Sequence, residues 1–316
     1  MRVSCAARIG TVKSSSAMFA QRRVFSMSNS ANPVLFRTDD GVELAGLRCL
    51  PMREPIGAIA MIHGFGEHAG RYLPLHRAFN AAGFAVAAAD LRGFGHSPGP
   101  RGHIERWDDY RRDAAAIVAQ AALLASDRPV FLFGHSMGGL IVLDYALQHP
   151  EGLAGVVASA PALIPGGARK PLLEIAARLL SRLVPRAGTR LGLDPAGISS
   201  QPEEVAAYLA DPLVSDRTTM RWGAEILRIM PDTLAQAGRF ALPLLLLQGS
   251  DDPINAPAGT RAFHATCGHP DCTLKFYPGN RHEVHHDISR SDFERDLIRW
   301  LKERAMRAPS ATGVQA

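Results

Sequence analysis

The sequence predicts an α/β fold with a mostly parallel central sheet, helices on both faces and an inserted helical cap. Two observations lead to this prediction. Short apolar runs of strand length alternate with amphipathic helical stretches, which is typical of βαβ crossovers in a parallel sheet. The alternation stops after residue 160 and resumes at residue 241, and the patterns in between are helical, which indicates an insertion between two strands of the sheet.

Most of the predicted strands precede the insertion. Residues 35–38 and 42–50 flank an Asp-Asp-Gly sequence, a pattern typical of a β-hairpin. Later strands are predicted from continuous apolar runs, as expected for strands buried on both faces. These strands are 58–62, 84–89, 130–133 and 156–159, and the intervening helices include 72–82 and 107–125. Asp108 or Asp109 is the expected N-cap of the second of these helices.

After the insertion the chain returns to the sheet pattern. Strands are predicted at 242–248 and 273–277, and helices at 257–266 and 291–307. A chain of 316 residues is long enough for one large domain with an inserted subdomain. The predicted division is a basic tail (1–28), a core (29–160 and 241–308), a helical cap or lid without buried strands (161–240) and a flexible C-terminus (309–316).

The positive charge of the chain is concentrated in its first 28 residues. The formal net charge is +5, from 35 basic and 30 acidic residues. Five of the basic residues and none of the acidic ones precede residue 28, so the remainder is close to neutral. The sequence therefore shows no basic surface of the kind that binds nucleic acid, and we expect no nucleic-acid partner.

The basic tail has no apolar segment of the length found in secretory signals, and no run in the chain reaches the roughly 18 apolar residues of a membrane span. We interpret it as a disordered tail or an upstream start, with Met27 as the true first residue. Its acid-free, Ser- and Arg-rich composition also fits a transit peptide. We expect a cytoplasmic protein that is peripheral at a membrane at most, with organellar targeting left open.

The cysteines do not form a disulfide framework. There are four of them, Cys5, Cys49, Cys267 and Cys272, which is too few for a disulfide scaffold. We expect Cys267 and Cys272 to be unpaired loop thiols. A local disulfide between them, or a metal site that includes His264, is the alternative.

A candidate nucleophile lies where a predicted strand meets a predicted helix. Residues 134–138 read Gly-His-Ser-Met-Gly, the G-x-S-x-G nucleophile elbow. The flanking glycines let strand and helix approach without Cβ clashes, and the helix start directs free N–H groups toward an oxyanion formed on Ser136. The bare pattern is weak evidence, but the strand before it and the helix after it make it strong.

Candidate acid and base residues follow the serine in the chain order that this arrangement requires. A serine hydroxyl needs a histidine to take its proton and a carboxylate to orient that histidine. One later strand leads to Asp251 and Asp252, and spacing alone leaves this choice open. The last strand leads to three histidines, His282, His285 and His286, and we select His282 because it is closest to the strand end.

The loop after the first long parallel strand, residues 63–68, is the expected source of a second oxyanion donor. It is glycine-rich, so its backbone can turn an N–H group inward. We predict that the backbone N–H groups of Phe65 and Met137 form the oxyanion hole. The histidines and Glu67 of this loop are in no recognised metal-ligand spacing, so we predict no metal site.

Several motifs occur together in a fixed order: HGFGEHAGRY from His63, DLRGFGHS from Asp90 with RGH from Arg101, GHSMGG from Gly134, YLADPL from Tyr208, LQGSDD from Leu247 and HEVH from His282. Together they resemble the monoacylglycerol lipase and lysophospholipase group of the α/β-hydrolase superfamily, which is serine aminopeptidase S33-like. The resemblance covers about residues 35–301, with its largest departures in the cap.

The resemblance implies an α/β-hydrolase fold and assigns roles to particular residues. It implies Asp252 rather than Asp251 as the acid and His282 as the base. It also implies a supporting polar cluster at Glu67, Arg71 and His285.

An amphipathic stretch in the cap, residues 171–185, allows two interpretations. Its apolar and basic side chains separate at helical spacing. The apolar set is Leu172, Leu173, Ile175, Ala176, Leu179, Leu180, Leu183 and Val184, and the basic set is Arg178, Arg182 and Arg186. The helix either contacts a lipid surface and receives an acyl chain, or packs on the sheet domain.

These inferences predict a serine hydrolase that cleaves lipid esters, most specifically monoacylglycerols, through an acyl-enzyme on Ser136 and without a cofactor. Lysophospholipase or general carboxylesterase activity is the main alternative. An aminopeptidase is less favoured, although Glu203, Glu204 and Glu225 offer cap carboxylates for a free amine. From another class, the chain is also compatible with a non-catalytic lipid-binding protein on the same scaffold.

Overall fold

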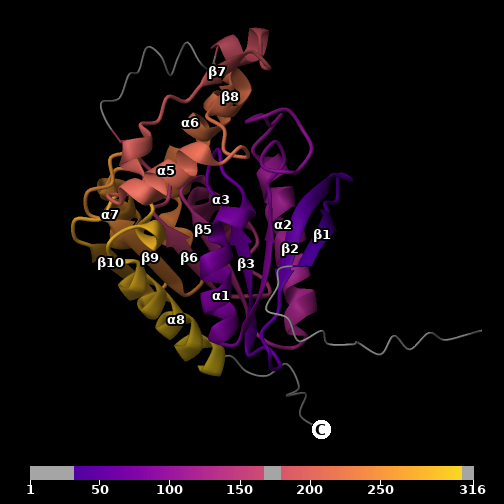
Figure 1. Cartoon of the computed structure of the whole chain (residues 1–316), viewed down its shortest axis with the longest axis vertical. Helices are drawn as coiled ribbons and strands as arrows, with labels where there is room; N and C mark the ends of the chain where they lie inside the picture. Colours follow the sequence, from indigo (N-terminus) through magenta and orange to yellow (C-terminus); the bar gives the residue numbers. More distant parts are fainter. Residues whose placement is uncertain (1–31, 167–178, 308–316) are drawn as a thin grey trace, which may run out of the picture.

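An eight-stranded sheet forms the centre of the computed structural model, which describes residues 32–166 and 179–307 (Figure 1). The strand order is β1-β2-β4-β3-β5-β6-β9-β10. The first two pairings along this order are antiparallel and the others are parallel. The strands are β1 (Asn32–Arg37), β2 (Glu43–Cys49), β3 (Gly57–Ile62), β4 (Phe84–Ala89), β5 (Val130–His135), β6 (Leu153–Ser159), β9 (Leu244–Gly249) and β10 (Cys272–Tyr277).

Helices cover both faces of this sheet. On one face lie α1 (Leu73–Ala81) and α8 (Arg290–Arg307). A 3₁₀ turn, η1 (Ala69–Tyr72), precedes α1. Phe79 of α1 and Trp300 of α8 belong to one apolar cluster on this face. On the other face lie α2 (Asp108–Ala125), α3 (Met137–Gln148) and α7 (Pro257–Thr266), with a second apolar cluster. The predicted α/β-hydrolase arrangement is confirmed.

The strands β3, β4 and β5 are buried at every position, which explains their uninterrupted apolar sequences. The predicted N-cap of α2 is wrong. Trp107 precedes the helix without a side-chain capping bond, and Asp108 and Asp109 belong to its first turn. Their negative charges still stabilise the N-terminus of α2, where backbone N–H groups are unpaired.

The segment between β6 and β9 is mainly helical, with one difference from prediction. It contains η2 (Pro195–Gly197), α5 (Pro202–Ala210), α6 (Met220–Ala235) and η3 (Ala237–Arg239). It also contains two short antiparallel strands, β7 (Gly188–Arg190) and β8 (Arg217–Thr219), of which β8 is partly buried. The expectation of no buried strand is therefore wrong, because three-residue strands have no recognisable apolar period. The division into core and cap stays a prediction.

The amphipathic cap stretch is described only from residue 179. Residues 179–183 are helical, and Leu179, Leu180, Leu183 and Val184 are exposed, Leu183 to 78%. The predicted stripe residues up to Arg178 lie outside the described residues, as do the predicted tail and C-terminus. The described part of the stripe thus presents apolar side chains to solvent. None of the described helices is long and apolar enough to span a bilayer.

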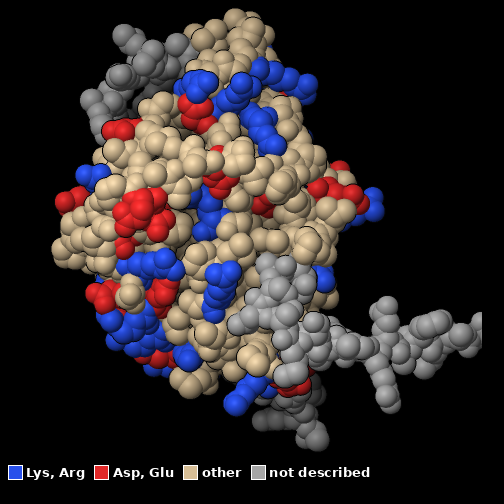
Figure 2. All heavy atoms as spheres, viewed as in Figure 1, with Lys and Arg blue, Asp and Glu red and all other residues tan. Residues whose placement is uncertain are grey.

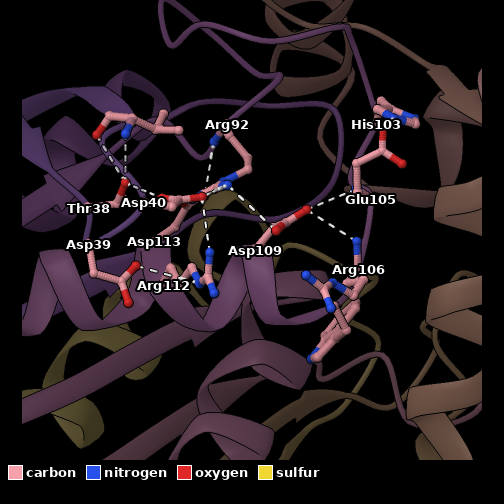
Figure 3. Close-up of polar contacts among 12 residues, drawn as sticks. Thr38, Asp39, Asp40, Arg92, His103, Glu105, Arg106, Asp109, Arg112 and Asp113 are labelled. Carbon is pink, nitrogen blue, oxygen red and sulfur yellow. Dashed lines mark hydrogen bonds and ion pairs between the residues drawn. The ribbon is translucent and has the colours of Figure 1, made fainter.

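The loop after β4 is tied to α2 and to the β1–β2 hairpin by an ionic group that we call the Arg92 cluster: Asp40, Arg92, Asp109 and Asp113 (Figure 3). The Arg92 guanidinium lies 2.8 Å from Asp40 and 2.7 Å from Asp113. The same loop contacts the cap, because His103 Nδ1 lies 3.0 Å from the Thr219 hydroxyl. This loop therefore links the sheet domain to the segment above it.

The three described cysteines, Cys49, Cys267 and Cys272, are free thiols. Cys267 and Cys272 are unpaired as predicted, although Cys272 is the first residue of β10 rather than part of a loop. A hydrogen bond from the Cys272 thiol lowers the pKa of Cys267 to about 7, although burial alone would raise it.

Candidate active site

Ser136 occupies a strained turn between β5 and α3. Its backbone has φ 56° and ψ −117°, in a region that residues other than glycine rarely adopt. A Cβ at Gly138 would overlap the carbonyl oxygens of Ile62 and His63, so only glycine fits there. The turn is held by a 2.9 Å hydrogen bond from Ser136 N to Ser159 O. These contacts place the serine at the carboxyl edge of the sheet, directly before the N-terminus of α3.

His282 and Asp252 form a buried pair. Asp252 Oδ2 lies 2.8 Å from His282 Nδ1 and also accepts a 2.7 Å hydrogen bond from Gln248 Nε2. Its other oxygen accepts hydrogen bonds from the backbone N–H groups of Ile254 and Asn255. The carboxylate is therefore fixed in the orientation that holds the Nδ1–H tautomer of the histidine.

The other candidates for acid and base lie elsewhere. Asp251 is exposed and accepts a hydrogen bond from the neighbouring Ser250 hydroxyl. His286 Nδ1 lies 2.8 Å from Glu283, and His285 stacks on Tyr72 with ring centroids 5.0 Å apart. Of the predicted acids and bases, Asp252 and His282 contact each other, and His282 borders the same cavity as Ser136.

Burial and charge act in opposite directions on His282. Burial lowers the pKa of its imidazole, but the charge of Asp252 and its hydrogen bond outweigh burial and raise the pKa above the ordinary value. The neighbouring His135, whose ring centroid lies 4.7 Å from that of His282, has a pKa far below the ordinary value because of burial. Of these two histidines, His282 is therefore the one that is more easily protonated.

A narrow cavity of about 30 Å³ with a mixed polar and apolar lining, which we call the polar cavity, borders both Ser136 and His282. Its polar lining includes Glu67, Tyr208 and Glu283. The Ser136 hydroxyl also accepts a long hydrogen bond of 3.4 Å from Asn255 Nδ2. The volume is enough for one or two water molecules or the hydroxyl groups of a small alcohol.

A larger and almost entirely apolar pocket of about 220 Å³ also borders Ser136. It lies between the sheet domain and the inserted segment, and α6 supplies much of its wall. The lining includes Phe65, Met137, Ala162, Leu191, Leu193, Trp222, Ile226 and Met230. The serine therefore stands at the junction of an apolar and a polar compartment. Phe65 and Met137, the predicted sources of oxyanion donors, both border the apolar one.

Glu67 holds the turn that contains Phe65. Its Oε1 accepts hydrogen bonds of 2.6 Å from the backbone N–H of Gly64 and from the Tyr72 hydroxyl. The Arg71 guanidinium lies 3.1 Å from the other oxygen of Glu67 and 2.7 Å from Glu283. We call Glu67, Arg71, Glu283 and His286 the Arg71 cluster. The predicted supporting residues Glu67 and Arg71 thus contact each other, whereas His285 contacts its neighbours through its ring faces.

Histidines of the loop after β3 are engaged by the protein itself. His63 Nε2 accepts a 2.8 Å hydrogen bond from Leu91 N, and its Nδ1–H donates to Gly64 O. His68 Nε2 lies 2.9 Å from Asp211 in the cap. These contacts give the loop histidines a structural role.

Sequence reasoning missed Glu283 and Asn255. Glu283 is 3% exposed, and only its position directly after His282 pointed to it. Asn255 Nδ2 donates to both Ser136 Oγ and Ala160 O. Isolated Glu and Asn residues in loops are usually solvated, so their sequence signal is weak.

The cap carboxylates considered for a peptidase are not at this site. On α5, Glu203 is exposed and Glu204 is partly buried. Glu225 accepts a 3.0 Å hydrogen bond from Trp107 N and pairs with Arg228. None of the three is among the described residues that line the two compartments.

Comparison with known proteins agrees with this geometry. The model of the family described as "Serine aminopeptidase, S33" matches residues 53–289. The monoacylglycerol lipase of Mycolicibacterium smegmatis is 34% identical over 252 residues, which cover 79% of this chain and 90% of that protein. The crystal structure of Paleococcus ferrophilus monoacylglycerol lipase is 35% identical, with a TM-score of 0.77, over 83% of this chain and 99% of that one. A Bacillus subtilis phospholipase, YtpA, is 28% identical over 75% of this chain and 92% of its own length.

Proposed function

The chain belongs to the serine aminopeptidase S33 family and is a lipid ester hydrolase, and from this premise we propose that it cleaves monoacylglycerols to glycerol and a fatty acid. The observation that carries the proposal is the meeting of an apolar and a polar compartment at Ser136. An acyl chain fits the first, and the second has room for hydroxyl groups of the leaving alcohol. The resemblance inferred from the motifs is confirmed.

In the proposed mechanism Ser136 Oγ attacks the ester carbonyl while His282 Nε2 accepts its proton. The hydrogen bond to Asp252 keeps the proton of the neutral histidine on Nδ1, which leaves Nε2 free as a base. The charge of Asp252 then stabilises the imidazolium, in agreement with the raised pKa of His282. The developing oxyanion accepts hydrogen bonds from the backbone N–H groups of Phe65 and Met137, the latter at the N-terminus of α3.

Collapse of the tetrahedral intermediate breaks the ester bond, and His282 donates its proton to the leaving alcohol oxygen. A water molecule then enters the polar cavity, and His282 removes its proton as it attacks the acyl-enzyme. The fatty acid leaves and Ser136 regains its proton. Protein groups alone carry these steps. Glu67 and Arg71 support them by fixing the turn that carries Phe65, and His285 supports them by packing against His135.

The cap is proposed to make transient contact with a lipid surface. The exposed apolar side chains Leu179, Leu183 and Val184 are close in sequence to two exposed arginines, Arg186 and Arg190, which pair with Glu105 and Asp216. Figure 2 shows basic side chains gathered at the end of the molecule that β7 and β8 occupy. Apolar insertion combined with attraction to anionic head groups is the usual basis of such contact.

Lysophospholipase activity is the second candidate, because a relative of similar coverage is named a phospholipase. Glu203, Glu204 and Glu225 do not line the two compartments, so the cap carboxylates give no support to aminopeptidase activity. A non-catalytic protein is disfavoured by the pairing of His282 with Asp252 beside Ser136.

The test is a hydrolysis series in which monoacylglycerols, lysophospholipids and aminoacyl amides carry matched chains. We expect monoacylglycerols to have the highest kcat/KM. A fluorophosphonate probe should label the folded wild type and not Ser136→Ala, with loss of more than about 10³-fold in kcat for that variant. Turnover of acetyl esters without turnover of long-chain monoacylglycerols would contradict the proposal, and absence of labelling would contradict a serine hydrolase altogether.

A further inference from the structure

The wall of the polar cavity carries two carboxylates, and their counter-charges lie behind them. Glu67 and Glu283 both line the cavity. Arg71, which pairs with both, and His286, which pairs with Glu283, are not among its described lining residues. A ligand in this cavity therefore lies closer to the two carboxylates than to their counter-charges.

Glu283 is held rigidly in this wall. Its Oε2 accepts a 2.7 Å hydrogen bond from Arg71 and a 2.8 Å hydrogen bond from His286 Nδ1. Its backbone N–H donates a 2.7 Å hydrogen bond to Ile198 O in the cap. Movement of the side chain out of the wall would break these bonds. No described residue donates to its Oε1, which leaves that oxygen able to accept a hydrogen bond from an alcohol hydroxyl.

Glu283 is also ionised at neutral pH. Burial raises the pKa of its carboxyl, but the hydrogen bond from His286 and the charge of Arg71 outweigh burial and lower the pKa to about 2. Arg71 supplies one positive charge against the two carboxylates, and the histidines that line the cavity add no fixed positive charge to it. His135 is neutral because burial lowers its pKa far below the ordinary value, and His282 must be neutral to act as a base.

We propose that Glu283 is a specificity-determining residue, which selects an uncharged polyol as the leaving alcohol and disfavours a head group that carries a phosphate. This inference rests on the proposed function, because it assigns the polar cavity to the alcohol. A hydroxyl donates to the carboxylate, whereas a phosphate brought to the same wall meets the like charge of two buried carboxylates. The same wall therefore separates monoacylglycerols from lysophospholipids.

The experiment compares monooleoylglycerol with oleoyl lysophosphatidic acid in the wild type and in Glu283→Gln. Glutamine has nearly the same size, so the substitution removes charge without enlarging the cavity. We expect the ratio of kcat/KM values, monooleoylglycerol over lysophosphatidic acid, to fall at least about tenfold. Effects on the chemical step shared by both substrates cancel in this ratio.

The matched control is Glu225→Gln, which neutralises a partly buried cap carboxylate that does not line the cavity. Its ratio should equal that of the wild type. An unchanged ratio in Glu283→Gln, or an equal change in the control, would overturn the role of Glu283 while leaving the proposed monoacylglycerol hydrolysis intact.

A second measurement needs neither a variant nor monoacylglycerol turnover. Glycerol and glycerol 3-phosphate are compared as inhibitors of p-nitrophenyl butyrate hydrolysis by the wild type. We expect glycerol 3-phosphate to be at least about tenfold weaker. Equal or stronger inhibition by glycerol 3-phosphate would contradict the inference even if Glu283→Gln fails to fold.

Discussion

Arg71 and Arg92 each lie between carboxylates, and the two ion clusters that they form differ in burial. In the Arg71 cluster the side chains of Arg71, Glu67 and Glu283 are 7%, 3% and 4% exposed. In the Arg92 cluster, Arg92 is 11% exposed, Asp113 is fully buried, and Asp40 reaches solvent at 23% (Figure 3). Water can therefore solvate some of the charged groups of the Arg92 cluster but almost none of those of the Arg71 cluster.

The two clusters also differ in what they border. Two members of the Arg71 cluster line the cavity at Ser136, whereas the Arg92 cluster joins the loop after β4 to α2 and the β1–β2 hairpin. Similar ion pairs thus border the cavity at Ser136 in one place and anchor a loop in the other. Which role an ion cluster plays depends on its burial and on the presence of an adjoining cavity, and variants matched across the two clusters test this distinction.

The largest expected effect is on stability. Arg71→Met leaves Glu67 and Glu283 buried without their cation, and we expect the free energy of unfolding to fall by about 3–5 kcal/mol. Arg92→Met should cost about 1–3 kcal/mol, because solvent reaches Asp40 and Asp109. Urea unfolding with equal m-values measures both. A larger loss of unfolding free energy in Arg92→Met than in Arg71→Met would contradict this prediction.

The next effect is on catalysis. Glu67→Gln weakens the charged hydrogen bonds to Gly64 N and the Tyr72 hydroxyl that fix the turn containing Phe65. At about 1.5–3 kcal/mol for bonds of this kind, kcat/KM should fall about 10–100-fold. Asp113→Asn, the matched change in the Arg92 cluster, should alter kcat/KM less than about threefold. Initial rates with p-nitrophenyl butyrate measure both changes. Equal losses of kcat/KM in the two variants would show that the clusters are not functionally distinct.

The comparison also indicates which features the sequence can predict. Ser136 and His282 were predictable because strand ends meet at one edge of a parallel sheet, so chain order alone limits their partners. The choice between Asp251 and Asp252 depends on a turn in which backbone N–H groups of Ile254 and Asn255 point at one carboxylate. Spacing does not reveal that orientation, and the family resemblance was needed to make the choice.

Glu283 was not predictable, because its burial depends on contacts distant in sequence. Arg71 lies 212 positions earlier, and Ile198, which accepts its backbone N–H, lies in the cap. The strands β7 and β8 were missed for a similar reason, since three residues each carry too little pattern and their pairing depends on the cap fold. Long, uniformly buried strands were predicted well, whereas features that depend on cap packing were not.

The third prediction concerns pH. His282 must be neutral to act as a base, so kcat/KM should fall as the pH decreases through its pKa, which the charge of Asp252 raises above the ordinary value despite burial. The charge of Glu283 also raises this pKa. Glu283→Gln should therefore move the acid limb of the kcat/KM profile to lower pH, because loss of an anion makes the imidazolium less favourable.

Asp40→Asn is the control for this shift, since Asp40 belongs to the other cluster and contacts Arg92 rather than the histidine. Its acid limb should coincide with that of the wild type. A shift of equal size in Asp40→Asn, or a shift of the limb to higher pH in Glu283→Gln, would be incompatible with local action of Glu283 on His282.

The smallest effect is expected at the solvent edge of the Arg92 cluster. Arg112 is 39% exposed and lies 3.5 Å from Asp39, which is 75% exposed, and 3.5 Å from Asp40. Exposed pairs of this kind are screened by water and salt, so Arg112→Ala should change the free energy of unfolding by no more than about 0.5 kcal/mol. Urea unfolding at low and at 1 M NaCl, alongside Arg92→Met, measures the difference. A loss of more than about 1 kcal/mol, still present in 1 M NaCl, would show that Arg112 acts as part of the buried cluster, and exposure would then be a poor guide to which of these arginines the fold depends on.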